Sequence, residues 1–260
     1  MQKLIALLLF ILLLTVGLCA CGEQQSPDTP AEAGTEQTDT AAIRSAFDNA
    51  SAYIESVIDT SDMTFEIQDD NNGAELIKNW YIKGEPANDP LSTAIELDGV
   101  AIEIGKTTPK DLEELGFTLS AEATTVEPGT STGFSISKGD KETNISLATN
   151  DTDKAVSIYD LPVTGVTSFD YEYALQLSYC GLNKGSTLKD LTDKLGRPNY
   201  IISLESDEYA DRITVGYSYE IVDKGMITLY VYCANLIYDP ESNSAAISQM
   251  NYSSETYPAE

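Results

Sequence analysis

Two short stretches decide the fold that this sequence predicts: GKTTPKDLEELG at residues 105–116 and GSTLKDLTDKLG at residues 185–196. In each stretch a threonine, Thr108 or Thr187, stands at the place of a helix N-cap, where its hydroxyl accepts a backbone hydrogen bond. The closing glycine suits the left-handed conformation that ends many helices. The threonines lie 79 positions apart (187 minus 108) and the closing glycines 80 (196 minus 116), and this recurrence predicts a short helix in each of two similar units. The alternative is a chance match between two ordinary capped helices.

Segments with the alternation of β-strands surround both predicted helices. Asp98-Gly99 divides two apolar runs, 94–97 and 100–104, and favours a type I′ hairpin turn. The other strand candidates are 133–138 and 143–149 after the first helix, and 200–204, 212–222 and 226–238 after the second. Each predicted helix is therefore followed by antiparallel strands.

A longer helix is predicted at the start of the folded part. Apolar residues such as Phe47 and Ile54 recur along 41–59 at helical spacing, and strand signals follow at 63–67 and 76–82. We therefore expect an α+β fold, in which an N-terminal amphipathic helix precedes two similar units of short helix plus antiparallel sheet. The expected segments are a helix and hairpin at 41–90, a first helix-plus-sheet unit at 91–170, a second at 171–252 and a flexible tail at 253–260.

The first residues have the layout of an exported protein. A single positive charge, Lys3, precedes an uncharged and mostly apolar run from 4 to 18, which is typical of a secretory signal peptide. The run is shorter than the roughly 20 apolar residues that a membrane-spanning helix needs. We expect a signal peptide over 1–20, and no polytopic membrane protein because no second run of that length follows.

The end of this run, Leu-Cys-Ala-Cys-Gly at 18–22, resembles the lipobox of bacterial lipoproteins. Leu18 matches the aliphatic position, Ala20 the small residue before the cut, and Cys21 the cysteine that receives the lipid. Cys19 is a competing acceptor, but the bulky Leu18 stands directly before it. The resemblance implies that a diacylglyceryl lipid on Cys21 holds the protein on the extracytoplasmic face of the cell membrane. An ordinary cleaved signal peptide or an uncleaved anchor is the alternative.

Residues 21–40 predict a disordered acidic tether between the anchor and the folded part. From Gly22 to Thr40 this stretch contains five acidic residues, no basic residue and no large apolar residue. Such a composition cannot bury enough surface to offset the loss of chain entropy on folding.

The charged residues exclude several classes of function. The chain has 42 acidic and 15 basic residues and no histidine. A nucleic-acid-binding protein needs a basic face, so we expect no nucleic-acid partner. The absence of histidine removes the commonest general base and metal ligand. We therefore expect no enzymatic activity, no cofactor and no metal site, although the negative charge would permit calcium or a basic partner.

The sequence leaves two catalytic alternatives. Ser186 and Lys189 lie three positions apart and could form a Ser-Lys dyad. They stand at a predicted helix start, however, where such residues commonly serve as caps. A hydrolase that uses carboxylates alone is the second alternative, since acidic residues are abundant.

The predicted folded part contains two cysteines, Cys180 and Cys233. Outside the membrane such a pair can form a disulfide, and both lie in the second predicted unit. The alternative is a pair of small buried apolar side chains.

The tyrosines are unevenly distributed, since twelve of the fifteen lie at or after Tyr171. Pairs two positions apart share one face of a predicted strand, and tyrosine is enriched at binding interfaces. These pairs are Tyr217 with Tyr219 and Tyr230 with Tyr232. They predict a binding face, although tyrosine also suits an ordinary half-buried sheet surface.

The second unit also resembles the repeat of small outer-membrane-assembly lipoproteins of the SmpA/OmlA type, and the beta-lactamase-inhibitor protein is similar. The residues that carry the resemblance are Gly185, Thr187, Asp190, Leu191, Leu195, Gly196, Pro198, Tyr217 and Tyr219. Those families have a second helix before the sheet, and this sequence predicts none. The first unit has Phe117 and Thr118 in place of the proline. The whole layout resembles lipoproteins of low-GC Gram-positive bacteria.

These resemblances imply a non-catalytic binding or adaptor module for a protein or envelope component. One alternative is a substrate-binding lipoprotein of an importer, which predicts two α/β lobes with parallel strands. The hairpin signals favour antiparallel strands instead.

Overall fold

The computed structural model describes residues 40–69, 76–82, 92–169, 172–205 and 211–259. Cys19 and Cys21, the predicted signal peptide and all but the last residue of the predicted tether lie outside these ranges. None of the described helices is both long and apolar enough to cross a membrane.

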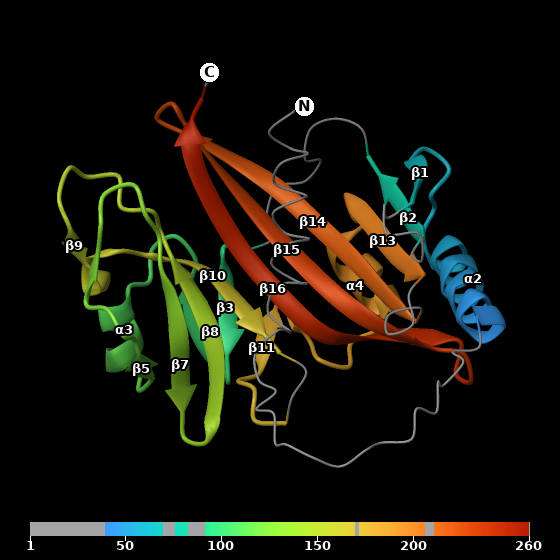
Figure 1. The fold of residues 1–260 in the computed structure, drawn as a ribbon, viewed down its shortest axis with the longest axis horizontal. Coiled ribbons are helices and arrows are strands. Elements are labelled where there is room, and N and C mark those ends of the chain that lie inside the picture. Colours follow the sequence, from blue (N-terminus) through green and yellow to red (C-terminus); the bar gives the residue numbers. More distant parts are fainter. Residues whose placement is uncertain (1–39, 70–75, 83–91, 170–171, 206–210, 260) are drawn as a thin grey trace, which may run out of the picture. The chain divides into compact units, whose positions relative to one another are not determined.

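Ten strands form one antiparallel sheet, whose three longest strands are neighbours (Figure 1). Across the sheet the strands are β1 (Thr64–Asp69), β2 (Leu76–Tyr81), β13 (Tyr200–Glu205), β14 (Arg212–Asp223), β15 (Met226–Asp239), β16 (Ser244–Pro258), β10 (Val163–Ser168), β8 (Lys141–Leu147), β7 (Gly133–Lys138) and β5 (Thr118–Ser120).

A second antiparallel sheet, a strand pair and four helical elements complete the described fold. In order across it, the strands of the second sheet are β12 (Leu182–Asn183), β11 (Leu177–Tyr179), β3 (Ala94–Leu97) and β4 (Val100–Glu103). Two further strands, β6 (Thr125–Val126) and β9 (Val156–Ser157), pair only with each other. The helical elements are α2 (Thr40–Val57), α3 (Pro109–Glu114), α4 (Leu188–Leu195) and the 3-10 turn η1 (Ile158–Asp160).

The expected α+β class is wrong, because the described fold is largely β. Strands contain 50% of the described residues, whereas the three α-helices contain 16%. The helix starts themselves were predicted correctly: Thr108 and Thr187 each form a capping box with the aspartate three residues later. The helices they begin, α3 and α4, have only six and eight residues. They connect strands and do not form a layer comparable to the sheet.

The two predicted units share both sheets. β16 from the second predicted unit pairs with β10 from the first, and β11 pairs with β3 in the smaller sheet. The N-terminal hairpin joins the same large sheet through the pairing of β2 with β13. Backbone hydrogen bonds between strands that are distant in sequence therefore join the predicted segments into shared sheets.

Helices and the smaller sheet cover one face of the large sheet and enclose the core. The apolar stripe of α2, including Ile54 at 0% exposure, belongs to the same buried cluster as Leu191 of α4 and Leu177 of β11. Tyr232 of β15, also at 0% exposure, is part of this cluster.

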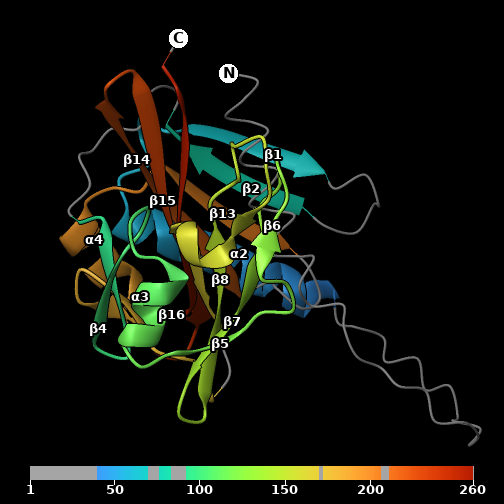
Figure 2. The same ribbon diagram turned by 90° about the vertical axis from the view of Figure 1, so that its left-hand side faces the viewer.

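The turn between β7 and β8 and the C-terminal end of β16 lie at opposite ends of the fold. In both Figure 1 and Figure 2 the turn is at the bottom and the end of β16 is at the top.

The C-terminal segment 253–260 was expected to be a flexible tail, but β16 extends through Pro258. Residues 253–258 pair with β15, up to Met226 opposite Pro258. The strand was missed there because residues 253–256, Ser-Ser-Glu-Thr, are all polar and show no apolar alternation.

Candidate interaction surface

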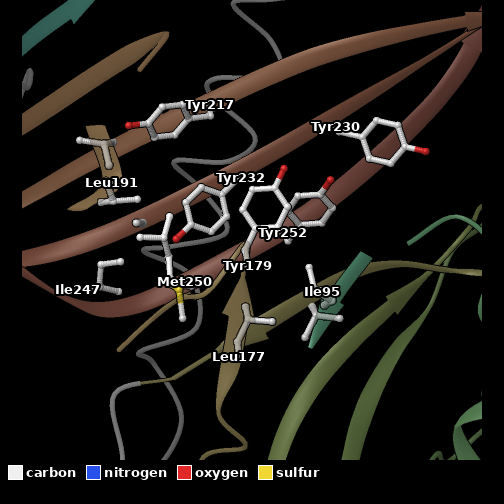
Figure 3. Close-up of a cluster of buried hydrophobic side chains, with 14 of the residues drawn as sticks. Ile95, Leu177, Tyr179, Leu191, Tyr217, Tyr230, Tyr232, Ile247, Met250 and Tyr252 are labelled. Atoms are coloured by element: carbon white, nitrogen blue, oxygen red, sulfur yellow. The ribbon is translucent and has the colours of Figure 1, made fainter. Parts of the chain in front are cut away.

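The tyrosines predicted to form a binding face lie in the core (Figure 3). The exposed fractions are 1% for Tyr217, 5% for Tyr219, 8% for Tyr230 and 0% for Tyr232. Each pair shares one face of its strand, as predicted, but that face is the one that packs against β11 and the helices. The prediction of an exposed tyrosine surface is therefore wrong.

Contacts among phenol rings hold this cluster together. The ring centroid of Tyr179, on β11, lies 4.9 Å from that of Tyr232 and 4.8 Å from that of Tyr252. The hydroxyl oxygens of Tyr179 and Tyr219 are 2.5 Å apart. Tyr179 and Tyr252 both donate to the backbone oxygen of Ser92, at 3.1 and 3.0 Å. These contacts join the smaller sheet to the larger one.

Burial also makes these phenols unsuitable for proton transfer near neutral pH. Desolvation raises the pKa of Tyr217, Tyr219, Tyr232 and Tyr252 above the ordinary phenol value of 10.0. They remain protonated and structural at physiological pH.

The two cysteines are free thiols in the described chain, so the predicted disulfide is absent from this structure. Side chains alternate along β15, and Tyr232 points toward Tyr179. The next residue, Cys233, therefore points to the opposite face, where its thiol lies beside Tyr200. Cys180 directly follows Tyr179 and packs against the core. The large sheet separates the two sulfur atoms.

We expect Cys233 to be nearly inert toward iodoacetamide in the folded protein at pH 8. Burial raises the pKa of its thiol from 9.0 to about 11, which leaves about a hundredth of the usual thiolate. Mass spectrometry of the labelled peptides, with and without denaturant, measures the difference. Rapid native labelling of Cys233, or its recovery in a disulfide with Cys180, would contradict this arrangement.

The Ser-Lys alternative gains no geometric support from the described residues. The Ser186 hydroxyl accepts a hydrogen bond from the backbone N–H of Asn183 at 3.1 Å. Lys189 pairs with Asp193 at 2.5 Å, within α4. Neither side chain activates the other. In the described ranges, no group of three or more cysteine, aspartate or glutamate side chains is arranged to hold a metal ion.

Three strands extend past their neighbours and form what we call the arm. β13 pairs with β14 only as far as Gly216, and β10 pairs with β16 only as far as Ser253. Beyond these points lie residues 217–223, 226–232 and 254–258, which pair with one another. Within the described chain no strand pairs with the outer edges of this part. At the top of Figure 1, β14, β15 and β16 converge at the end of the arm.

No protein-family model, curated protein or solved structure matches this chain.

The end of the arm exposes apolar side chains on both faces of the sheet. Val222 is 67% exposed, and Ile221 and Met226 are 37% and 39% exposed. Adjacent residues point to opposite faces of a strand, so Val222 lies on one face and Ile221 on the other. The turn itself is Lys224-Gly225, and both residues have positive φ, 51° and 78°, as a type I′ hairpin turn requires.

The charges near this end are few and mostly negative. Asp223 and Lys224 pair with each other at 3.7 Å. Further along the arm, Tyr257 donates to Glu220 at 3.1 Å. The end of the arm therefore exposes apolar side chains with a weakly acidic border, an arrangement that suits binding better than chemistry.

The stretch Glu-Ile-Val-Asp-Lys-Gly-Met-Ile at 220–227 already indicates exposed apolar side chains at this turn. Two apolar residues in succession on each side of a hairpin turn cannot both face the core, because side chains alternate. One of each pair must face outward.

Proposed function

We propose that this protein is a lipoprotein anchored through Cys21 on the extracytoplasmic face of the cell membrane. Its folded part acts as a non-catalytic binding or adaptor module for a protein or envelope component. The end of the arm, with Ile221, Val222 and Met226, is its contact surface. This surface replaces the tyrosine face that the sequence suggested.

The lipobox-like stretch 18–22 supports the anchor, and a diacylglyceryl group supplies the two acyl chains that stable anchoring needs. The single observation that carries the binding role is the exposure of Val222 at 67% at the end of the arm. Ile221 and Met226 are exposed on the opposite face, so both faces of this end offer apolar side chains to a partner. The antiparallel pairing of the large sheet disfavours the importer alternative, which predicts parallel strands.

A photo-cross-linking amino acid at position 222, in the full chain on intact cells, tests this proposal. We expect a cross-link to one or a few defined envelope components in the membrane fraction. The same probe at Asp140, an exposed residue in the turn between β7 and β8, should not give these products. In both views that turn lies away from the end of the arm (Figures 1 and 2).

The Cys21→Ala variant supplies the control for anchoring. It should move the protein to the soluble fraction, because the acyl chains that hold it have been removed. Persistence in the membrane fraction would refute the lipid anchor. Identical cross-links from positions 222 and 140 would refute the arm as the contact surface.

A further inference from the structure

The outer strand of the large sheet has an open edge. β1 pairs with β2 over six residues, from Thr64 opposite Tyr81 to Asp69 opposite Leu76. No described strand lies on its other side. The strand at the far edge of the sheet, β5, has only three residues. A six-residue edge offers a row of backbone N–H and C=O groups to an added strand.

Exposed apolar side chains accompany this edge. Phe65 is 47% exposed and Ile67 is 57% exposed. Both point to the same face, because they lie two positions apart. The Phe65 ring centroid is 5.1 Å from that of Trp80, which is buried at 3% exposure. Natural edge strands usually carry charges, prolines or bulges that prevent pairing. β1 has neither a proline nor a bulge, so its protection rests on acidic side chains.

The other face of the edge carries a negative charge. Glu66 is exposed between Phe65 and Ile67, and its carboxylate accepts a hydrogen bond from Tyr81 at 2.6 Å. The chain as a whole has a net charge of −27. Pairing between two copies of β1 would bring two such chains together, and their mutual repulsion opposes it. A basic partner is attracted instead.

We propose that β1 accepts an extended segment of a partner protein in which apolar and basic residues alternate. The added strand pairs with the backbone of β1, its apolar side chains contact Phe65 and Ile67, and its basic side chains lie beside Glu66. This mode of binding takes its affinity from main-chain hydrogen bonds and its specificity from alternate side chains. The site is distinct from the arm, since β2 and β13 separate β1 from β14.

The chain contains its own reporter for this site, because Trp80 is the only tryptophan and lies on the neighbouring strand. The probe is the synthetic peptide KVKVKVK, titrated into the full-length protein in a neutral detergent. We expect a saturable change in Trp80 fluorescence and slower hydrogen exchange of the backbone amides at 64–69. The peptide KKVVVKK has the same composition without the alternation, and it should bind at least about tenfold more weakly.

Substitutions separate strand addition from general attraction to a negative protein. Ile67→Lys should weaken binding of KVKVKVK by at least about tenfold. Leu115→Lys adds the same charge at a residue 42% exposed at the end of α3, and it should leave binding unchanged. A Glu66→Lys variant should prefer EVEVEVE. Absence of binding, equal binding of both basic peptides, or protection of amides outside β1 would each overturn the proposal.

Discussion

Replacement of Tyr232 by alanine is expected to lower the free energy of unfolding by about 3–5 kcal/mol, the range for truncating a buried aromatic side chain. Tyr232 has no exposed surface, and its ring contacts Tyr179 and more distantly Tyr217 and Tyr252. Alanine would leave a cavity between the large sheet and β11, and the rings of three strands could not close it without moving the backbone.

Urea unfolding followed by circular dichroism measures this loss. Tyr159→Ala is the matched control, because Tyr159 is 36% exposed and makes one long hydrogen bond, 3.4 Å, to Glu113. It should cost less than about 1 kcal/mol. If Tyr232→Ala left stability unchanged and abolished partner binding, the tyrosines would be a contact surface after all.

The hydroxyl group of Tyr232 can be removed separately from its ring. Among the described residues it is buried without a hydrogen-bond partner. Tyr232→Phe should therefore leave stability unchanged or raise it, since it removes an unsatisfied polar group. Tyr179→Phe removes a hydroxyl that contacts Tyr219 and Ser92, and it should cost about 1–3 kcal/mol.

Local features of this fold could be predicted from the sequence because short-range chemistry determines them. Thr108 caps α3, and Asp98-Gly99 forms a turn in which both φ angles are positive, at 47° and 76°. The bounds predicted for β7, 133–138, are those observed. In each case the deciding interactions lie within a few residues of one another.

The arrangement of these elements could not be predicted, because it depends on contacts between distant segments. Alternation shows that Tyr217 and Tyr219 share a face, but it does not show which face another layer will cover. The order of strands has the same difficulty: nothing local in β16 indicates that it pairs with β10, about 80 residues earlier. The repeat predicted around α3 and α4 stays a prediction: a two-strand hairpin precedes each helix, but the pairing between the two units could not be read from it.

The second large effect is expected at Gly216, in the middle of β14. A Cβ atom built there would lie 2.0 Å from ring atoms of Tyr200. That ring belongs to the neighbouring strand, opposite Gly216, and is only 7% exposed. Because the ring is confined, we expect Gly216→Ala to cost about 1–3 kcal/mol, the usual effect of overpacking a filled interior.

A double-mutant cycle with Tyr200→Ala tests this cause. If the clash with the ring is responsible, Gly216→Ala should cost much less in the Tyr200→Ala background, with a coupling of about 0.5–3 kcal/mol between the two sites. Gly165→Ala is the matched control, since a Cβ there meets Ser146 at 3.4 Å, an ordinary contact. It should be neutral or slightly stabilising, because alanine reduces the freedom of the unfolded chain. Equal costs for Gly216→Ala in both backgrounds would mean that the backbone of β14, and not the Tyr200 ring, requires glycine.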